Sequence, residues 1–401
     1  MALPILKTNI RKKILLIILI LPSFLLNYFT LTLFDHDNNL SIFSTVLVCS
    51  FNIINISFAY IYLKFNFKTL IIFVSYFFIL FLVFDFSLEK ILNKNSLHSE
   101  SLDLGWALNP NVEIKLIQKN LEEDRYEVKF KSSTVVGFRE YGKLDSNKKK
   151  ILLFGDSLTV GPHSSNGKMY YDVIKNELIK NKIDLEWFVM GGGGYSTVQQ
   201  LLLFKKHFKI IKPEIILHQF CVNDFFDNSY NINKLYTAHD QFYRRPFYRN
   251  GDYFKNESYK AKIYRFLFKH SFIFKKIDQI YIFKKFKKYG RLTKDISKKD
   301  INESIENTKQ MFNEIKNLIN SNIIYMSINC ANENKFNLDK VWKQIIYNIE
   351  GHPIDSPSNY LKLAKKQMPF LFHEDGGHLS EAGNKIYGEL ISKEILKILD
   401  K

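Results

Sequence analysis

Three long stretches without charge lie in the first 88 residues, and they constrain the fold more than any other feature of the chain. Residues 14–34 and 41–63 contain no acidic or basic side chain, and residues 69–88 contain only Asp85. About 20 apolar residues in a helix cross the hydrocarbon core of a bilayer, where every backbone polar group must be bonded within the protein. We therefore expect three transmembrane helices that anchor the chain through residues 1–88. A cleaved signal peptide would explain only the first of them.

The charges around these stretches predict the orientation of the anchor. Four Lys or Arg residues precede the first stretch, Asp35 and Asp37 follow it, and Lys64 and Lys68 follow the second. Loops rich in Lys and Arg stay in the cytoplasm. Three crossings then place everything after residue 88 outside the cytoplasm, in the periplasm or on the outer surface of a bacterium.

Composition narrows the class of protein further. The chain has 401 residues, of which 46% are hydrophobic, and this excludes a disordered protein. A formal net charge of +17 suits nucleic acid or anionic lipid as a partner. Lys is spread through the chain together with Asn, Ile and Phe, however, and no nucleic-acid-binding motif is present. We therefore expect no nucleic-acid partner.

The three cysteines do not indicate a metal or redox site. Cys49 lies in an apolar stretch, and no pair has the CxxC spacing of a zinc knuckle or a redox motif. Cys221 and Cys330 are interpreted as small buried residues, and a disulfide between them stays open.

From residue 151 the sequence alternates between strand and helix patterns, after a mixed, polar lead-in over residues 89–150. Strands are predicted over 151–154, 185–190, 214–220 and 323–328, and helices over 169–180, 198–211 and 301–319. Such alternation is typical of a parallel sheet with helices on both faces. We expect residues 151–401 to form a three-layer α/β/α, flavodoxin-like domain. In sheets of this kind, ligands bind beyond the carboxyl ends of the strands.

Residues 230–296 do not fit this alternation and are predicted to be an insertion. One interpretation is a helix packed on the domain with a solvated basic face, and the other is a helix that lies on the membrane or covers the active site as a lid. The pattern consists of Ile263, Phe266, Leu267, Ile273, Phe274, Ile277, Ile280 and Tyr281 at helical spacing, with Lys262, Arg265, Lys269, Lys275, Lys276, Lys284 and Lys285 between them.

A serine follows the first predicted strand, in the sequence Gly155-Asp156-Ser157-Leu158. By itself this motif also suits an ordinary turn or helix cap. Near the other end of the chain, Asp375 stands three residues before His378, with two glycines between them. A serine hydroxyl becomes a good nucleophile when a neighbouring base takes its proton. We expect His378 to be that base and Asp375 to orient it and stabilise its charged form.

Acyl transfer also needs donors for the negative charge that develops on the carbonyl oxygen. The run Gly191-Gly192-Gly193-Gly194 follows the second predicted strand, and Asn223-Asp224 follows the third. A glycine run or an Asn-Asp pair can also be a plain turn. Because each feature follows a strand of the same sheet, we expect an oxyanion hole formed by Ser157, Gly194 and Asn223.

Together these four blocks resemble the SGNH/GDSL hydrolase superfamily over about residues 151–399. Block one matches Gly155-Asp156-Ser157-Leu158, block two matches Gly194 before Tyr195-Ser196-Thr197, block three matches Asn223-Asp224, and the last matches Asp375 with His378. Cys221 departs from the pattern, because the family usually has glycine there. The resemblance implies an esterase, lipase, thioesterase or carbohydrate O-acyl esterase, and some relatives are O-acetyltransferases. It implies no metal and no cofactor.

Three rival motifs fail on their spacing. Residues 161–168 differ from a phosphate-binding loop by one extra residue, and Met169 replaces the expected Ser or Thr. His373 and His378 are one residue too far apart for a zinc protease helix, which the glycines between them would also break. The pattern GxSxG of the α/β-hydrolases does not surround Ser157.

The sequence therefore predicts a serine-dependent ester hydrolase that acts on an envelope glycan or lipid through an acyl-enzyme. An O-acetyltransferase on an envelope polysaccharide, supplied by an acyl-donor partner, is the alternative. A binding module without catalysis is a further one.

Overall fold

The computed structural model describes residues 96–236, 238–289, 295–319, 322–328, 338–347, 349–355 and 358–399, with scattered positions between 52 and 87. Contacts between residues divide the chain into two units, Met1–Glu89 and Lys90–Lys401.

The first unit contains the three stretches that are predicted to span a membrane. Residues 14–34 and most positions of 41–63 lie outside the described residues, as do some positions of 69–88. The positions that are described in these stretches are helical. Among the helices that the structure describes, none is both long and apolar enough to cross a membrane. The anchor therefore stays a prediction.

The second unit is built on a six-stranded sheet, which confirms the predicted α/β fold with a mostly parallel sheet. The strand order is β12-β11-β8-β6-β7-β5, and only β5 runs antiparallel to its neighbour. The five parallel strands follow the doubly wound order of flavodoxin. The strands are β5 (Phe138–Tyr141), β6 (Lys150–Gly155), β7 (Glu186–Gly191), β8 (Ile215–Cys221), β11 (Asn322–Ile328) and β12 (His352–Pro353).

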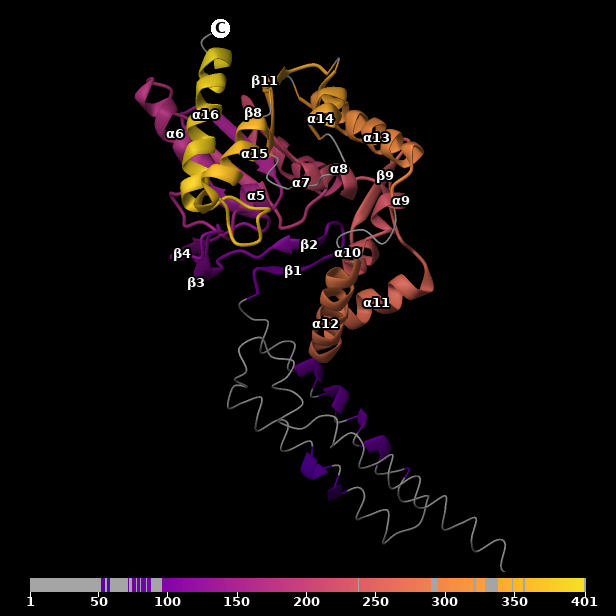
Figure 1. Ribbon diagram of the computed structural model, residues 1–401. Coiled ribbons are helices and arrows are strands. Elements are labelled where there is room, and N and C mark those ends of the chain that lie inside the picture. The colour runs from indigo at the N-terminus through magenta and orange to yellow at the C-terminus, as the bar shows by residue number, and fades with distance from the viewer. Residues whose placement is uncertain are drawn as a thin grey trace, which may run out of the picture. The chain divides into compact units, whose positions relative to one another are not determined.

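The central strands β6 and β8 are buried along almost their whole length because helices cover both faces of the sheet. In β6, Ile151 and Phe154 are both fully buried although their side chains point to opposite faces. Helices α6 and α16 lie side by side, and α7 contacts α13 (Figure 1). These four helices are α6 (Tyr170–Lys180), α7 (Thr197–Ile211), α13 (Lys298–Asn317) and α16 (Glu381–Leu399).

Shorter elements complete the described part of the domain. They are α5 (Ser157–Val160), α8 (Val222–Asp227), α14 (Leu338–Ile346), α15 (Ser358–Gln367) and the 3₁₀ turn η1 (Pro369–Leu371).

The predicted lead-in over residues 89–150 contains strands that the sequence analysis missed. They are β1 (His98–Ser101), β2 (Gly105–Leu108), β3 (Glu113–Lys119) and β4 (Arg125–Lys131), followed by β5. β1 pairs with β2 and β3 with β4, each antiparallel. Tyr126, Val128 and Phe130 alternate with charged residues along β4, which is the pattern of a half-buried strand. This signal was present in the sequence.

Residues 230–289 follow α8 and, where the structure describes them, form a group of four helices and one β-hairpin. They are α9 (Tyr230–Asn233), α10 (His239–Arg244), β9 (Pro246–Arg249), β10 (Asp252–Lys255), α11 (Tyr259–His270) and α12 (Phe272–Tyr289). β9 and β10 form a hairpin of their own, and α11 packs on α10 and α12.

Both outer strands of the six-stranded sheet are short. β12 pairs with β11 through only His352 and Pro353, and the register of β5 on β7 shifts between Phe138 and Glu140.

Candidate active site

Ser157 stands directly beyond β6, at the first position of α5. Asp156 caps this helix, because its Oδ1 accepts the N–H of Leu158 at 2.9 Å. A Cβ atom on Gly155 would lie 2.2 Å from Oε1 of Gln219 and 2.4 Å from Oγ1 of Thr159. Only glycine therefore allows the strand to end this close to its neighbours and turn into the helix.

Residues 373–378, called the base loop here, position the imidazole of His378. Oδ1 of Asp375 accepts the N–H groups of Gly377 at 2.8 Å and His378 at 3.0 Å. The N–H of His373 donates to the carbonyl of His378 at 3.0 Å and closes the loop. With Oδ1 bound in this way, Oδ2 of Asp375 faces the ring of His378.

The structure brings Ser157, His378 and Asp375 into one chain of hydrogen bonds, although Ser157 and His378 are 221 residues apart. Nδ1 of His378 lies 2.6 Å from Oδ2 of Asp375, and Nε2 lies 2.8 Å from Oγ of Ser157. An ionised carboxylate only accepts hydrogen bonds, so Nδ1 carries the proton. Nε2 then accepts the hydroxyl of Ser157, which is the arrangement that a general base requires.

The contacts of the base loop make His378 more basic than an ordinary histidine. Burial alone would lower the pKa of His378, but the hydrogen bond and negative charge of Asp375 outweigh it and raise that pKa. Burial alone would raise the pKa of Asp375, but hydrogen bonds from His373 and His378 hold that pKa well below its usual range. Asp375 is therefore ionised at any pH at which an enzyme works.

Asp156 places a second carboxyl group beside the serine. It is fully buried, and Oγ of Ser157 lies 3.5 Å from its Oδ2. Burial raises the pKa of Asp156, against hydrogen bonds from the Leu158 N–H and the side chains of Asn223 and Cys221. The structure therefore places Asn223 next to the residue that precedes the serine.

The first turn of α8, which holds Asn223, is fixed by buried polar contacts. Oδ2 of Asp224 accepts the N–H of Cys221 at 2.9 Å, and Gln200 donates to the same carboxylate at 3.1 Å. Gln200 also bonds Nε2 of His218 at 2.9 Å. Cys221 has an extended backbone with φ of −113°, so this position does not require the glycine that is usual in the resembling family.

Residues 191–195, called the glycine loop here, follow β7 at the same edge of the sheet. Gly155 pairs with Gly191, so the loop begins beside the end of β6. Gly194 has φ of +65°, a left-handed conformation that favours glycine, whereas a Cβ there would meet no atom closer than 3.5 Å. The backbone conformation, and not lack of space, explains the glycine at position 194.

Contacts from the lead-in segment hold the glycine loop in place. The N–H of Gly193 donates to Nε2 of His98 at 3.2 Å, and Nε1 of Trp106 donates to the carbonyl of Gly193 at 2.8 Å. Burial and the nearby Arg244 lower the pKa of His98 to about 4, which keeps the ring neutral and able to accept. The hydroxyl of Tyr195 donates to the carbonyl of Trp106 at 2.8 Å.

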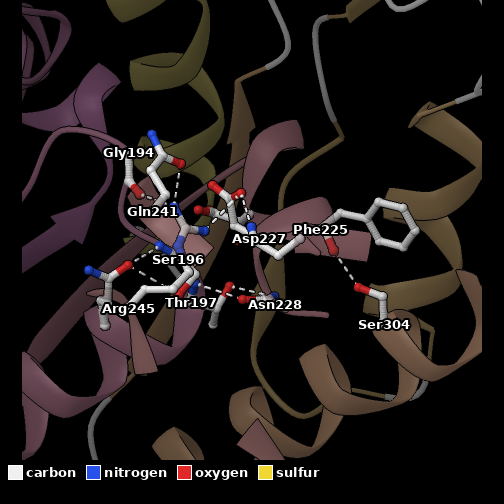
Figure 2. A network of polar contacts seen from close by, with 12 residues as sticks. Gly194, Ser196, Thr197, Phe225, Asp227, Asn228, Gln241, Arg245 and Ser304 are labelled. Carbon is white, nitrogen blue, oxygen red and sulfur yellow. Dashed lines mark hydrogen bonds and ion pairs between the residues drawn. The ribbon is translucent and has the colours of Figure 1, made fainter. Parts of the chain in front are cut away.

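A second set of contacts reaches the glycine loop from residues 230–289 (Figure 2). Nη2 of Arg245 donates to the carbonyl of Gly194 at 3.1 Å and to Oε1 of Gln241 at 2.6 Å. The buried Arg245 also forms an ion pair with the buried Asp227, at 2.8 Å. Asn233 donates to the same carboxylate at 3.0 Å. Arg245 therefore joins Gly194 to the end of α8.

Two side chains of the base loop and one beside it could hold a metal ion. Ligand atoms of His163, His373 and Asp375 all lie within 4.8 Å of one another. Nδ1 of His373 is 3.2 Å from Oδ2 of Asp375, the oxygen that also bonds His378. Burial, followed by the neighbouring His378 and His373, lowers the pKa of His163 to about 3. A cation bound here would compete with His378 for the carboxylate.

Several residues around the site were not predicted from the sequence. They are His98, Trp106, Asp156, His163, Gln200, Gln241, Arg245 and His373. Asp156 could have been recognised from its place in the serine motif. His163 and His373 lie in segments that were weighed for other motifs, and the remaining residues lie outside the motifs; only the folded chain brings them to the site. Cys330 lies outside the described residues, so the open disulfide is untested.

The chain belongs to the GDSL-like lipase/acylhydrolase family, because the model of that family matches residues 151–391. This match includes all four blocks that resemble the family. Family membership supports the hydrolysis of esters as the general activity of the protein.

Solved structures of esterases resemble the chain at low sequence identity. The esterase EstA from Pseudoalteromonas sp. is 12% identical, with a TM-score of 0.39 over 63% of this chain and 100% of that one. The lipase/acylhydrolase from Enterococcus faecalis is 18% identical, with a TM-score of 0.35 over 62% and 95% of the two chains. A catalytic mutant of Axe2, an acetylxylan esterase from Geobacillus stearothermophilus, is 15% identical, with a TM-score of 0.36 over 62% and 94%. No curated protein matches the chain.

Proposed function

We propose that the protein hydrolyses an ester on a glycan or lipid of the cell envelope, and that Ser157 carries the acyl group during the reaction. The observation behind this proposal is the hydrogen-bonded series of Ser157, His378 and Asp375, with distances of 2.8 Å and 2.6 Å.

In the first half of the reaction, Oγ of Ser157 attacks the ester carbonyl while Nε2 of His378 takes the hydroxyl proton. The imidazolium that forms is stabilised by Asp375. The carbonyl oxygen becomes an oxyanion, for which the N–H of Ser157, the N–H of Gly194 and the side-chain amide of Asn223 are the proposed donors. His378 then gives its proton to the leaving alcohol, and the acyl group stays on Ser157.

In the second half, His378 takes a proton from a water molecule as this water attacks the acyl-enzyme. A second tetrahedral intermediate collapses, Ser157 regains its proton from His378, and the carboxylic acid leaves. A sugar hydroxyl in place of water would give a transferase with the same residues. The acyl donor would then come from a partner protein.

Labelling with a fluorophosphonate tests the serine. We expect Ser157 to be labelled, and we expect Ser157→Ala to lose both labelling and the hydrolysis of short acyl esters. Unchanged ester turnover in this variant would overturn the mechanism. Absence of labelling in the unmodified protein would favour the binding module without catalysis.

A series of chromogenic esters from acetyl to palmitoyl, followed by product analysis with a glycan acceptor, tests the substrate class. Free acid as the product supports the hydrolase, and acylated glycan supports the transferase.

The proposal includes an anchor in the cytoplasmic membrane, with residues after 88 in the periplasm or on the outer surface. The uncharged stretches and the Lys and Arg residues around them support this placement. A reporter that works only in the cytoplasm, fused after Asp145, should be inactive, and an active reporter would contradict the placement.

A further inference from the structure

Helices α11 and α12 form a surface whose chemistry the proposed reaction does not use. One buried carboxylate, Asp278, holds the two helices together and onto α10. It accepts the hydroxyl of Tyr264 and lies 3.0 Å from Nε2 of His239. Because Asp278 points inward, the outer side of the two helices keeps no acidic side chain of its own.

Large apolar side chains are concentrated on this surface. Nineteen of them are exposed in the described part of residues 90–401, and nine belong to residues 259–289. Phe283 is 64% exposed and Phe286 is 54% exposed. On α12 they lie on more than one side of the helix, and so dense a group of exposed apolar side chains is rare on a soluble protein unless something covers it. The nine are Tyr259, Ile263, Phe266, Ile277, Ile280, Tyr281, Phe283, Phe286 and Tyr289.

The same surface is strongly basic. Residues 259–289 contain nine lysines and Arg265, against Asp278 alone. Nζ of Lys285 lies 4.6 Å from the ring centroid of Tyr281, and Nζ of Lys288 lies 4.9 Å from that of Tyr289. Lysine stems that lie along aromatic rings in this way can keep their ammonium groups in water while the rings enter an apolar phase.

We propose that this α11–α12 surface docks on a bilayer that contains anionic lipids. The headgroup region of such a bilayer offers both an apolar boundary for the rings and phosphates for the lysines. The apolar stretches of residues 14–34 and 41–63 could cover the rings, but they carry no negative charge that would attract the lysines. A nucleic acid or an acidic protein would suit the lysines but would leave several apolar side chains in water.

The experiment uses the full chain with a tryptophan at the surface and brominated phosphatidylcholine as the quencher. Its own Trp106, Trp187 and Trp342 are buried and provide a constant background. Phe286→Trp places a new indole on the surface. Ile117→Trp is the matched control, because Ile117 is 66% exposed on β3, outside α11 and α12. Vesicles contain phosphatidylcholine either alone or with phosphatidylglycerol.

We expect bromolipid to quench Phe286→Trp in vesicles with phosphatidylglycerol, and to quench Ile117→Trp no more than the unmodified chain. Reversing Lys284, Lys285, Lys287 and Lys288 to Glu should remove most of this quenching. Each lysine near an anionic surface contributes about fivefold to binding. Raised salt should also remove most of the quenching of Phe286→Trp when its lysines are unchanged. The test therefore remains valid if the fourfold variant fails to fold.

Three outcomes would overturn the proposal. Equal quenching of the two tryptophans would show that the α11–α12 surface does not contact the bilayer specifically. Quenching that is independent of both phosphatidylglycerol and salt would remove the role of anionic lipid. A blue-shifted but unquenched Trp at position 286 would show that protein, and not lipid, covers the surface. None of these readings depends on ester hydrolysis.

Discussion

The imidazole of the base loop is oriented by contacts within six residues, although β3 and α15 also bond the loop, whereas the glycine loop is held by residues from several distant segments. Asp375 binds the backbone of the two residues after Gly376 and then the ring of His378. Gly193 and Gly194 depend on Trp106 and Arg245, which are 87 and 51 residues away. The orientation of the base is therefore set within one short loop, whereas the backbone of the glycine loop is set by distant side chains. The two halves should fail in different ways when they are changed.

The largest effect is expected in the base loop. Asp375→Asn keeps the shape of the side chain but removes its charge, so His378 loses both its stabilising partner and its correct tautomer. We expect kcat to fall by about 10⁴-fold. Steady-state kinetics with a short acyl ester measures this. A fall of less than about tenfold would show that Asp375 is not the partner of the base.

The same variant should also change the pH dependence. His378 must be neutral to act as a base, so activity is lost as the pH falls through its pKa. Asp375 raises that pKa above the ordinary value, while burial opposes the rise. The acid limb of kcat/KM should therefore lie above pH 6.5, the unperturbed pKa of histidine, in the unmodified protein. In Asp375→Asn the acid limb of kcat/KM should move to lower pH. An acid limb at the same pH in both proteins would contradict the assignment of His378 as the titrating group.

In the oxyanion half, Asn223→Ala should lower kcat by about 10²–10³-fold, because a proposed donor to the oxyanion is lost. KM should change little, since this donor acts on the transition state, and the acid limb should stay near its original pH. A kinetic effect confined to KM would assign Asn223 to substrate binding.

Arg245 tests whether distant contacts control the glycine loop. Arg245→Met alone leaves Asp227 as an unpaired buried charge, at a cost of about 3–5 kcal/mol in stability. The double variant Arg245→Met/Asp227→Asn removes that charge and still lacks the donor to Gly194. We expect its kcat to fall by about tenfold, as for a lost charged hydrogen bond, with an unchanged pH profile and near-normal KM.

Arg249→Met is the matched control for this test. Arg249 lies in the same group of elements and pairs with Glu303 at 2.9 Å, but its side chain is 42% exposed and does not contact the glycine loop in the described structure. It should leave kcat unchanged. Equal losses in both variants would show a general effect on residues 230–289, and not a link to Gly194.

The smallest effect is expected from His373→Phe. This change removes one of two imidazole contacts to Oδ2 of Asp375 and keeps a ring in contact with His163. A single hydrogen bond contributes about 1 kcal/mol, so kcat/KM should fall only about fivefold. A loss as large as that of Asp375→Asn would make His373 an essential part of the base loop.

The contrast between the two halves also explains how much could be predicted from the sequence. Four of the six strands of the sheet, and the helices predicted between them, agree with the structure to within a few residues, because apolar runs and helical periodicity are local signals. The two short outer strands, β5 and β12, were missed. Ser157, Asp375 and His378 were found because each stands in a short motif beside a strand or loop. The strands of residues 98–131 were missed although β4 alternates, because the segment was interpreted from its polar composition.

The remaining residues of the site could not be predicted by the same means. Trp106 and Arg245 act through backbone carbonyls of the glycine loop. A contact of this kind leaves no pattern in the sequence, since any glycine carbonyl could accept it. His98 is likewise an ordinary histidine until burial keeps it neutral beside Gly193.

The short outer strands of the sheet have a consequence for the protein at high local concentration. A long open strand is a template on which a second molecule can add its own strand, and chains that are held close together meet this hazard most often. Here the outer strand β12 consists of two residues, one of them a proline without an N–H group. The outer strand β5 has four residues, and its register on β7 is interrupted. Neighbouring copies therefore find little backbone to pair with at either border, and a dense layer of the protein should resist aggregation between sheets.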